Sequence, residues 1–278
     1  MRALDLKLLR DLRRLRAQVV TIALVVAIGV GGFVGLFSVH GSLLQARDAF
    51  YSERQLADVF ASVRRAPLPL AARLAAIDGV AEVKTERVFD AQVELAGVEV
   101  PVTGRFIGLD LARVAAGRQG LNALALRSGR WPQPGAAIEA VVSDRFATVR
   151  GLVPGDHVHA LLGGRRARVQ VVGTVVSPEY VFATRGTGMD DETFGVWWID
   201  ERRIAQIFNM QGAFNQVALR LEAGVPAAAV IGCDPLIFMA GTLMHKGAND
   251  FDITGTVRGQ PAEFLMAPLT GLPVPAGA

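Results

Sequence analysis

Cysteine, charge and aromatic residues are all scarce in this chain of 278 residues. The single cysteine, Cys233, excludes a disulfide within the chain. Charged residues make up only 20% and aromatic residues 7%, while apolar residues reach 51% and the mean hydropathy is +0.35. That hydropathy is high for a soluble protein but too low for a chain that crosses a bilayer many times. One membrane anchor joined to a globular domain fits both limits.

The sequence also lacks the motifs of common catalytic and nucleotide sites. It has no G-x-x-x-x-G-K-[ST] phosphate loop, no G-x-S-x-G elbow and no H-E-x-x-H helix. His157 and His159 share one face of a predicted strand, but no third zinc ligand follows at a suitable spacing. Asp190, Asp191 and Glu192 are expected to form an exposed, solvated loop rather than a cation site. We therefore predict no enzyme activity, no catalytic residue, no metal and no cofactor.

One long uncharged run lies near the N-terminus. From Ala17 to Val39 no residue carries a full charge. At about 1.5 Å per residue, this run is long enough to cross a hydrocarbon core about 30 Å thick. A cleaved signal peptide has a shorter apolar core, of roughly 7–15 residues. The sequence therefore predicts an uncleaved transmembrane helix over residues 17–39.

Basic residues are concentrated just before this run. They are Arg2, Lys7, Arg10, Arg13, Arg14 and Arg16. Because positive flanks stay in the cytoplasm, we expect the N-terminus inside, the bulk of the chain outside, and Arg13, Arg14 and Arg16 as the cytoplasmic anchor. Residues 1–16 fit an amphipathic leader helix on the inner membrane surface, and equally an ordinary basic signal-anchor flank. The net charge of only +3, with no basic stripe elsewhere, disfavours nucleic acid as a partner.

Small residues cluster in the outer half of the predicted span. Gly31 and Gly35 make a small-xxx-small pair, which lets a second membrane helix approach closely. We predict that these two glycines pack against a partner helix. The alternative is that glycine is simply common in such helices.

Beyond the span, the apolar pattern alternates between helix and strand periods. Residues 40–57 keep helical character and are predicted to form a stalk. A strand near 59–63, a short helix from Leu70 to Ile77 and a strand over 80–88 then form a β-α-β unit.

Short paired strands with glycine turns dominate the middle of the chain. A hairpin is predicted over residues 93–102, and Gly163-Gly164 reverses the chain between two further strands. This pattern suggests a small barrel or sandwich. Asp200 is expected to cap a helix after the strand 194–199, and Pro226 opens a second helix after the strand 217–221. The predicted fold class is α+β: one transmembrane helix, then two small α/β lobes with a β-rich insert.

Several of these segments also match a known family pattern in order. The matching segments are Arg127-Ser128-Gly129-Arg130-Trp131-Pro132, Ala140 to Val142, Gly151-Leu152, Pro154-Gly155-Asp156, Val171-Val172-Gly173, Ser177-Pro178-Glu179-Tyr180-Val181 and Phe194-Gly195-Val196-Trp197-Trp198. With the basic leader and the first span, they make the chain resemble FtsX/MacB-like ABC transporter permeases over residues 1–231. On this resemblance, residues 58–231 are expected to be the extracytoplasmic core domain.

The resemblance implies a function and partners. Members of this family carry four transmembrane helices, act as dimers in the inner membrane, and work with a separate cytoplasmic ATPase. The implied function is a permease subunit, or a fragment of one, that couples an ABC ATPase to substrate handling or export outside the cytoplasm. The implied partners are that ATPase and a second permease chain, which can be a copy of this one.

The pattern departs from the family near Ile231. Gly232-Cys233-Asp234-Pro235 interrupts the expected helix, and Leu236 to Met244 is too short to cross a membrane. Residues 232–278 are therefore predicted to be a divergent, poorly ordered tail, as in a truncated or frame-shifted permease. The alternative function is a single-span envelope adaptor without transport activity. An anchored hydrolase is a third possibility, which the missing catalytic motifs disfavour.

Overall fold

The structure is a computed structural model, and it describes most of the chain. The described residues are 10, 15–95, 97–98, 100–180, 184–185, 188–189, 191–227, 230, 243–247, 250–257 and 260–264. By its contacts the chain divides into two units, Met1–Glu53 and Arg54–Ala278.

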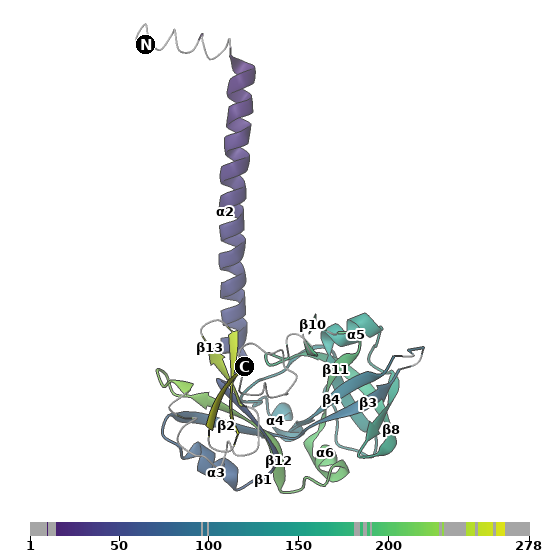
Figure 1. The fold of residues 1–278 in the computed structure, drawn as a ribbon. Helices are drawn as coiled ribbons and strands as arrows, with labels where there is room; N and C mark the ends of the chain where they lie inside the picture. The colour runs from purple at the N-terminus through teal and green to yellow at the C-terminus, as the bar shows by residue number, and fades with distance from the viewer. Residues whose placement is uncertain are drawn as a thin grey trace. The chain divides into compact units, whose positions relative to one another are not determined.

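The first unit consists of one helix in its described part. Helix α2 (Arg16–Glu53) runs unbroken for 38 residues, which is about 57 Å at 1.5 Å per residue (Figure 1). Its most apolar window has a mean hydropathy of 2.5 and no buried residue, so by length and composition it can cross a membrane. The predicted span and stalk are therefore one continuous helix. This helix ends at Glu53, earlier than the predicted residue 57, and Gln55 already has a left-handed φ of 51°.

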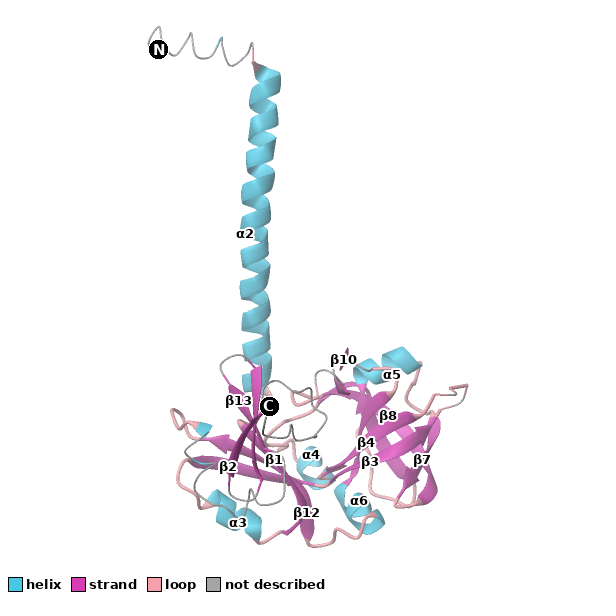
Figure 2. Cartoon of the chain, viewed as in Figure 1, coloured by secondary structure: helices cyan, strands magenta, loops and turns pink. Residues whose placement is uncertain are grey.

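The second unit contains two large sheets (Figure 2). The first sheet has six strands in the order β15-β14-β13-β1-β12-β2, and all its pairings are antiparallel. Its strands are β1 (Val59–Pro67), β2 (Val80–Glu86), β12 (Ala213–Leu221), β13 (Leu243–Gly247), β14 (Asp250–Val257) and β15 (Gln260–Phe264).

The predicted β-α-β unit is present but split by a distant strand. Strands β1 and β2 both pair antiparallel with β12, which makes them parallel to each other. Parallel strands need a crossover connection, and α3 (Leu70–Ala75) supplies it. The second predicted lobe therefore shares a sheet with the first, because its strand β12 lies between β1 and β2.

Three strands lie in the segment for which the sequence predicted a poorly ordered tail. Strand β13 pairs with β1, with Val59 opposite His245 and Ala61 opposite Leu243. Strands β14 and β15 extend the same sheet. The edge of β1 offers unpaired N–H and C=O groups to any segment that reaches it, and this long-range pairing leaves no local period in the sequence. The predicted helix opening at Pro226 falls largely outside the described residues.

The second sheet closes on itself. Its order is β5-β8-β6-β11-β4-β3-β7, and β7 also pairs with β8. The long strand β8 makes this possible, since its first half pairs with β7 and its second half with β5 and β6. The strands are β3 (Val88–Glu94), β4 (Val102–Leu109), β5 (Ala125–Gly129), β6 (Ile138–Ser143), β7 (His157–Leu162), β8 (Arg165–Val176) and β11 (Phe194–Asp200). Of the two predicted alternatives, a small barrel or a sandwich, the structure shows the barrel, and the α+β fold class is confirmed.

Short helices and tight turns complete this closed sheet. The helices are α4 (Leu111–Ala115), α5 (Asp144–Arg150) and α6 (Glu201–Ile207), and a two-stranded ribbon joins β9 (Thr184–Arg185) to β10 (Gly188–Met189). Asp200 caps α6 as predicted, with its carboxylate accepting from Arg202 N at 3.0 Å. The predicted reversal at Gly163-Gly164 joins β7 to β8, where φ values of 56° and 77° favour glycine.

Strand β11 divides two apolar cores. Trp197 and Ile199 enter the core inside the closed sheet, while Phe194, Val196 and Trp198 enter a second core on its other face. Every residue of β11 except Asp200 is buried, because both faces of the strand are covered. A third core, around Phe214 and Leu74, fills the space between the first sheet and α3.

Candidate functional site between the two sheets

The site residues predicted on the membrane helix lie on an open surface of this chain. A Cβ atom added at Gly31 or Gly35 would meet no atom within 4 Å. Arg16 is the exposed first residue of α2. Arg13 and Arg14 lie outside the described residues. Packing at the two glycines and anchoring by the three arginines stay predictions.

A polar junction joins the two sheets at a loop between α4 and β5. Gln119 clamps this loop: its Oε1 accepts from Leu124 N at 2.8 Å, and its Nε2 donates to Leu124 O at 3.2 Å. At the centre of the loop, Asn122 is 3% exposed and has a φ of 54°. Asparagine tolerates this left-handed conformation better than most residues.

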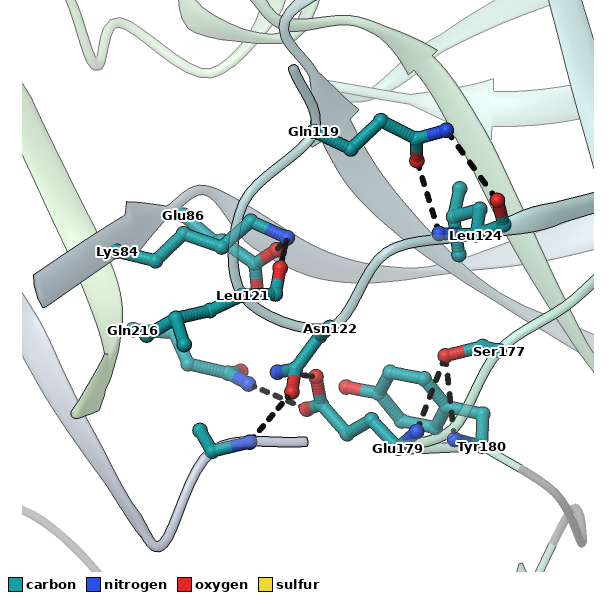
Figure 3. Close-up of polar contacts among 11 residues, drawn as sticks. Lys84, Glu86, Gln119, Leu121, Asn122, Leu124, Ser177, Glu179, Tyr180 and Gln216 are labelled. Atoms are coloured by element: carbon teal, nitrogen blue, oxygen red, sulfur yellow. Dashed lines mark hydrogen bonds and ion pairs between the residues drawn. The ribbon is translucent and has the colours of Figure 1, made fainter. Parts of the chain in front are cut away.

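Asn122 connects three separate parts of the domain (Figure 3). Its backbone N–H donates to Gln55 O at 3.0 Å, and its Oδ1 accepts from Ala57 N at 2.9 Å. Its Nδ2 donates to Glu179 Oε2 at 2.9 Å. The chain entering β1, the α4–β5 loop and the segment after β8 are therefore held by one buried side chain. We call Gln55, Ala57, Asn122, Glu179 and Gln216 the relay junction.

Glu179 is the acidic member of the relay junction. Its Oε1 accepts from Gln216 Nε2 of β12 at 2.9 Å, so it links the second sheet to the first. The Ser177 hydroxyl oxygen accepts from the backbone of Glu179 at 3.2 Å and of Tyr180 at 3.4 Å, which fixes the turn. Burial, and then the negative charge of Glu86, raise the pKa of Glu179 to about 7.

A second carboxylate lies close by on β2. Glu86 is 6% exposed, and its Oε1 is 2.8 Å from Lys84 Nζ. The same ammonium donates to Leu121 O at 2.9 Å. Glu86 Oε2 has no hydrogen-bond partner in the described part of the chain. A buried, unpaired carboxylate oxygen is costly, and such groups are found where they serve a purpose.

These groups line a cavity of about 250 Å³ between the two sheets. Its charged lining comprises four carboxylates and two cations: Glu86, Asp110, Glu179, Glu201, Lys84 and Arg113. Val83, Leu109, Leu124 and Trp198 supply apolar wall. The arrangement can bind a polar ligand and can hold the two sheets in register. A larger hollow of about 540 Å³ lies beside α4, with Trp131 and Pro132 in its lining.

The sequence did not single out Glu86, Asn122 or Glu179 as site residues. One signal was available, since Ser177-Pro178-Glu179 is a polar interruption between Val175-Val176 and Tyr180-Val181. Its partners are far away in sequence, and only the folded chain brings them together.

The structure describes residues of both groups that were considered as metal ligands, the two histidines and the acidic loop. His157 is exposed and His159 is half-buried on β7. Asp191 is ion-paired with Arg145, and its side chain is only 11% exposed, so the expected solvated loop is partly buried at this residue. In the described residues no group of three His, Cys, Asp or Glu side chains lies close enough to hold a metal ion.

Comparison with known proteins gives two kinds of match. The family model described as the 3-octaprenyl-4-hydroxybenzoate carboxy-lyase Rift-related domain of UbiD matches residues 181–278. No curated protein matches the chain.

Among solved structures, the chain is similar to the extracellular domain of the noncanonic ABC-type transporter YknZ from Gram-positive bacteria, with 14% identity and a TM-score of 0.40, over 63% of this chain and 87% of that one. It is also similar to the periplasmic region of MacB from Actinobacillus actinomycetemcomitans, with 10% identity and a TM-score of 0.39, over 65% of this chain and 82% of that one.

Proposed function

We propose that the chain is a permease-type subunit of an ABC transporter, whose outer domain receives motion from a separate cytoplasmic ATPase. The observation that carries the proposal is the relay junction. It fastens Gln55 and Ala57, which follow α2 in the chain, to the α4–β5 loop, and this loop through Glu179 to the segment after β8 and to β12. The family resemblance of the sequence supports the same role.

The relay junction is suited to pass on a displacement. Arg54 O and Gln55 O accept from the backbone of Ala123 and Asn122 at 2.9 and 3.0 Å. The Asn122 side chain continues the connection to Ala57 and Glu179. Each such bond contributes about 0.5–1.5 kcal/mol, and breaking one leaves a buried polar group unpaired. A movement of the chain at residue 54 therefore shifts the loop and both sheets together.

The membrane part has a matching role in this proposal. The N-terminus lies on the cytoplasmic side of the inner membrane, and Arg13, Arg14 and Arg16 hold the leader there. Gly31 and Gly35 form the contact with a second permease chain, or with a copy of this one. The chain itself is not an enzyme. The ATPase supplies the energy, and the outer domain acts on the substrate.

The test combines a pull-down with complementation. The tagged full chain is co-expressed with a candidate ABC ATPase from the same organism and with a second permease chain. We expect the ATPase to co-purify in detergent, and the three chains together to rescue a strain that lacks the intact permease. Asn122→Ala should keep the ATPase but fail to rescue, while the exposed-site control Gln92→Ala should rescue normally.

Two outcomes would contradict the proposal. Absence of the ATPase from the purified wild-type complex would remove its central partner. Rescue by this chain without an ATPase would favour the single-span adaptor instead.

A further inference from the structure

The cavity between the two sheets carries more negative charge than its own cations balance. Lys84 is already ion-paired with Glu86 Oε1 and donates to Leu121 O. Arg113 is ion-paired with Asp110, at 3.5 Å from its Oδ2. The side-chain donors to Glu179 are all uncharged: the amides of Asn122 and Gln216 and the hydroxyl of Tyr180. Glu201 has Arg87 at the long distance of 3.7 Å. With all four carboxylates ionised, the lining itself carries two more negative than positive charges, and with Glu179 protonated it carries one more. Arg87 lies outside the lining and offsets part of the charge of Glu201.

The strongest sign of a missing partner is Glu86. This side chain lines the cavity and is more than nine-tenths buried, yet its Oε2 has no hydrogen-bond partner in the described part of the chain. Its second oxygen is already paired with Lys84. Oε2 is itself buried, so a donor in the cavity reaches it only after a small shift of the side chain. Glu86 can then accept from one further donor without giving up an existing contact.

The raised pKa values of two other acidic groups in the lining indicate the same deficit of positive charge. The pKa of Glu201 is raised by burial and then by the charge of Asp110, with Arg87 acting in the opposite direction. The pKa of Glu179 is raised by burial and then by the charge of Glu86. A bound cation would lower both pKa values, because it stabilises the ionised carboxylates.

We propose that this cavity is a binding site for a small organic dication, with two ammonium groups separated by a short methylene chain. Single metal ions fit poorly, since the described carboxylates form no cluster of three around one point. The carboxylates instead lie on different elements: β2, the cap of α4, the segment after β8, and α6. Two separated ammonium groups can reach two of them at once.

The rest of the lining suits the methylene chain of such a ligand. Val83, Leu109 and Leu124 offer apolar contact, and the indole of Trp198 can face an ammonium group. The volume of about 250 Å³ accommodates a diamine of about six to ten heavy atoms. The ligand would bridge the two sheets, since it would contact β2 on one side and α4 or α6 on the other. The site is independent of the proposed partner ATPase.

The test is calorimetric titration of the full chain in detergent with two diamines of different chain length, 1,4-diaminobutane and 1,6-diaminohexane. Magnesium chloride and sodium chloride at equal ionic strength serve as comparison ligands. We expect saturable one-to-one binding of an amine, with Glu86→Gln and Glu201→Gln each weakening it about tenfold. Glu94→Gln removes an exposed carboxylate on β3 that does not line the cavity, and should leave binding unchanged.

Several outcomes would overturn the proposal. These are the absence of saturable amine binding at millimolar concentration, equal binding by magnesium, or unchanged binding in both cavity variants. Because Glu86→Gln also removes a partner of Lys84, its melting temperature is measured in parallel. If that variant unfolds, Glu201→Gln decides the question alone.

Discussion

Replacing Glu179 by glutamine should remove a pH dependence of stability that the buried carboxyl creates. The pKa of Glu179 in the folded chain is about 7, against an ordinary value of 4.5. Lys84 and Glu86 on β2, Tyr180 beside it, and the amide of Gln216 are the groups that act on it. Burial and Glu86 oppose ionisation more strongly than Lys84 and the hydrogen bonds favour it.

The sign follows from proton binding. Between pH 4.5 and 7 the folded chain holds the proton on Glu179 while the unfolded chain has released it. The stabilisation is therefore complete below pH 4.5 and is lost as the pH rises through about 7. The full difference corresponds to at most about 3 kcal/mol. Because the side chain keeps some exposure to solvent, we expect about 1–2 kcal/mol.

The substitution itself is tolerated by the hydrogen bonds. Asn122 is held in one orientation because its Oδ1 accepts from Ala57 N. Gln216 can turn its amide, so that a glutamine at position 179 accepts from Asn122 and donates to Gln216. The variant therefore keeps both contacts but cannot ionise.

The assay uses the intrinsic fluorescence of the full chain in detergent. Its three tryptophans, Trp131, Trp197 and Trp198, all lie in the second unit, so fluorescence reports the unfolding of that unit. In a domain of this size, each kcal/mol of stability corresponds to about 2–4 °C of melting temperature. Between pH 5 and pH 8 the melting temperature of the wild type should therefore fall further than that of Glu179→Gln, by this amount for each kcal/mol that ionisation of Glu179 costs. Glu94→Gln should behave like the wild type. Equal pH slopes in the wild type and Glu179→Gln would show that the carboxyl is already ionised in the folded chain.

Three further predictions concern packing, capping and topology. A Cβ at Gly195 would lie 2.7 Å from Cδ1 of the buried Phe146, so Gly195→Ala should destabilise by about 1–3 kcal/mol in tryptophan-monitored melting, whereas Gly135→Ala, with nothing within 4 Å, should be neutral. Asp200→Ala removes the cap of α6 and should cost about 1 kcal/mol in the same assay, and an unchanged melting temperature would count against the cap. A reporter fused at Arg64 should be active only outside the cytoplasm, and cytoplasmic activity would reverse the proposed orientation.

Local features of the fold could be predicted from the sequence. The uncharged run of residues 17–39 is continuous along the chain, so hydropathy alone identified the helix that the structure describes as part of α2. Gly163-Gly164 produced a tight reversal because only glycine takes such φ values freely. Asp200 caps α6 through a contact two residues along the chain. Each of these features depends on neighbours in sequence.

The sheet order and the relay junction depended on tertiary structure. Nothing local places β12 between β1 and β2, or carries β13 to the free edge of β1. Asn122 and Glu179 are 57 positions apart, and each is an ordinary polar residue until burial removes the water that would otherwise satisfy it. The sequence by itself determined the anchor, the turns and the mixed α/β character. The cavity and its charge balance were decided only by the packing of two sheets, since burial and long-range pairing set the electrostatics of a carboxylate.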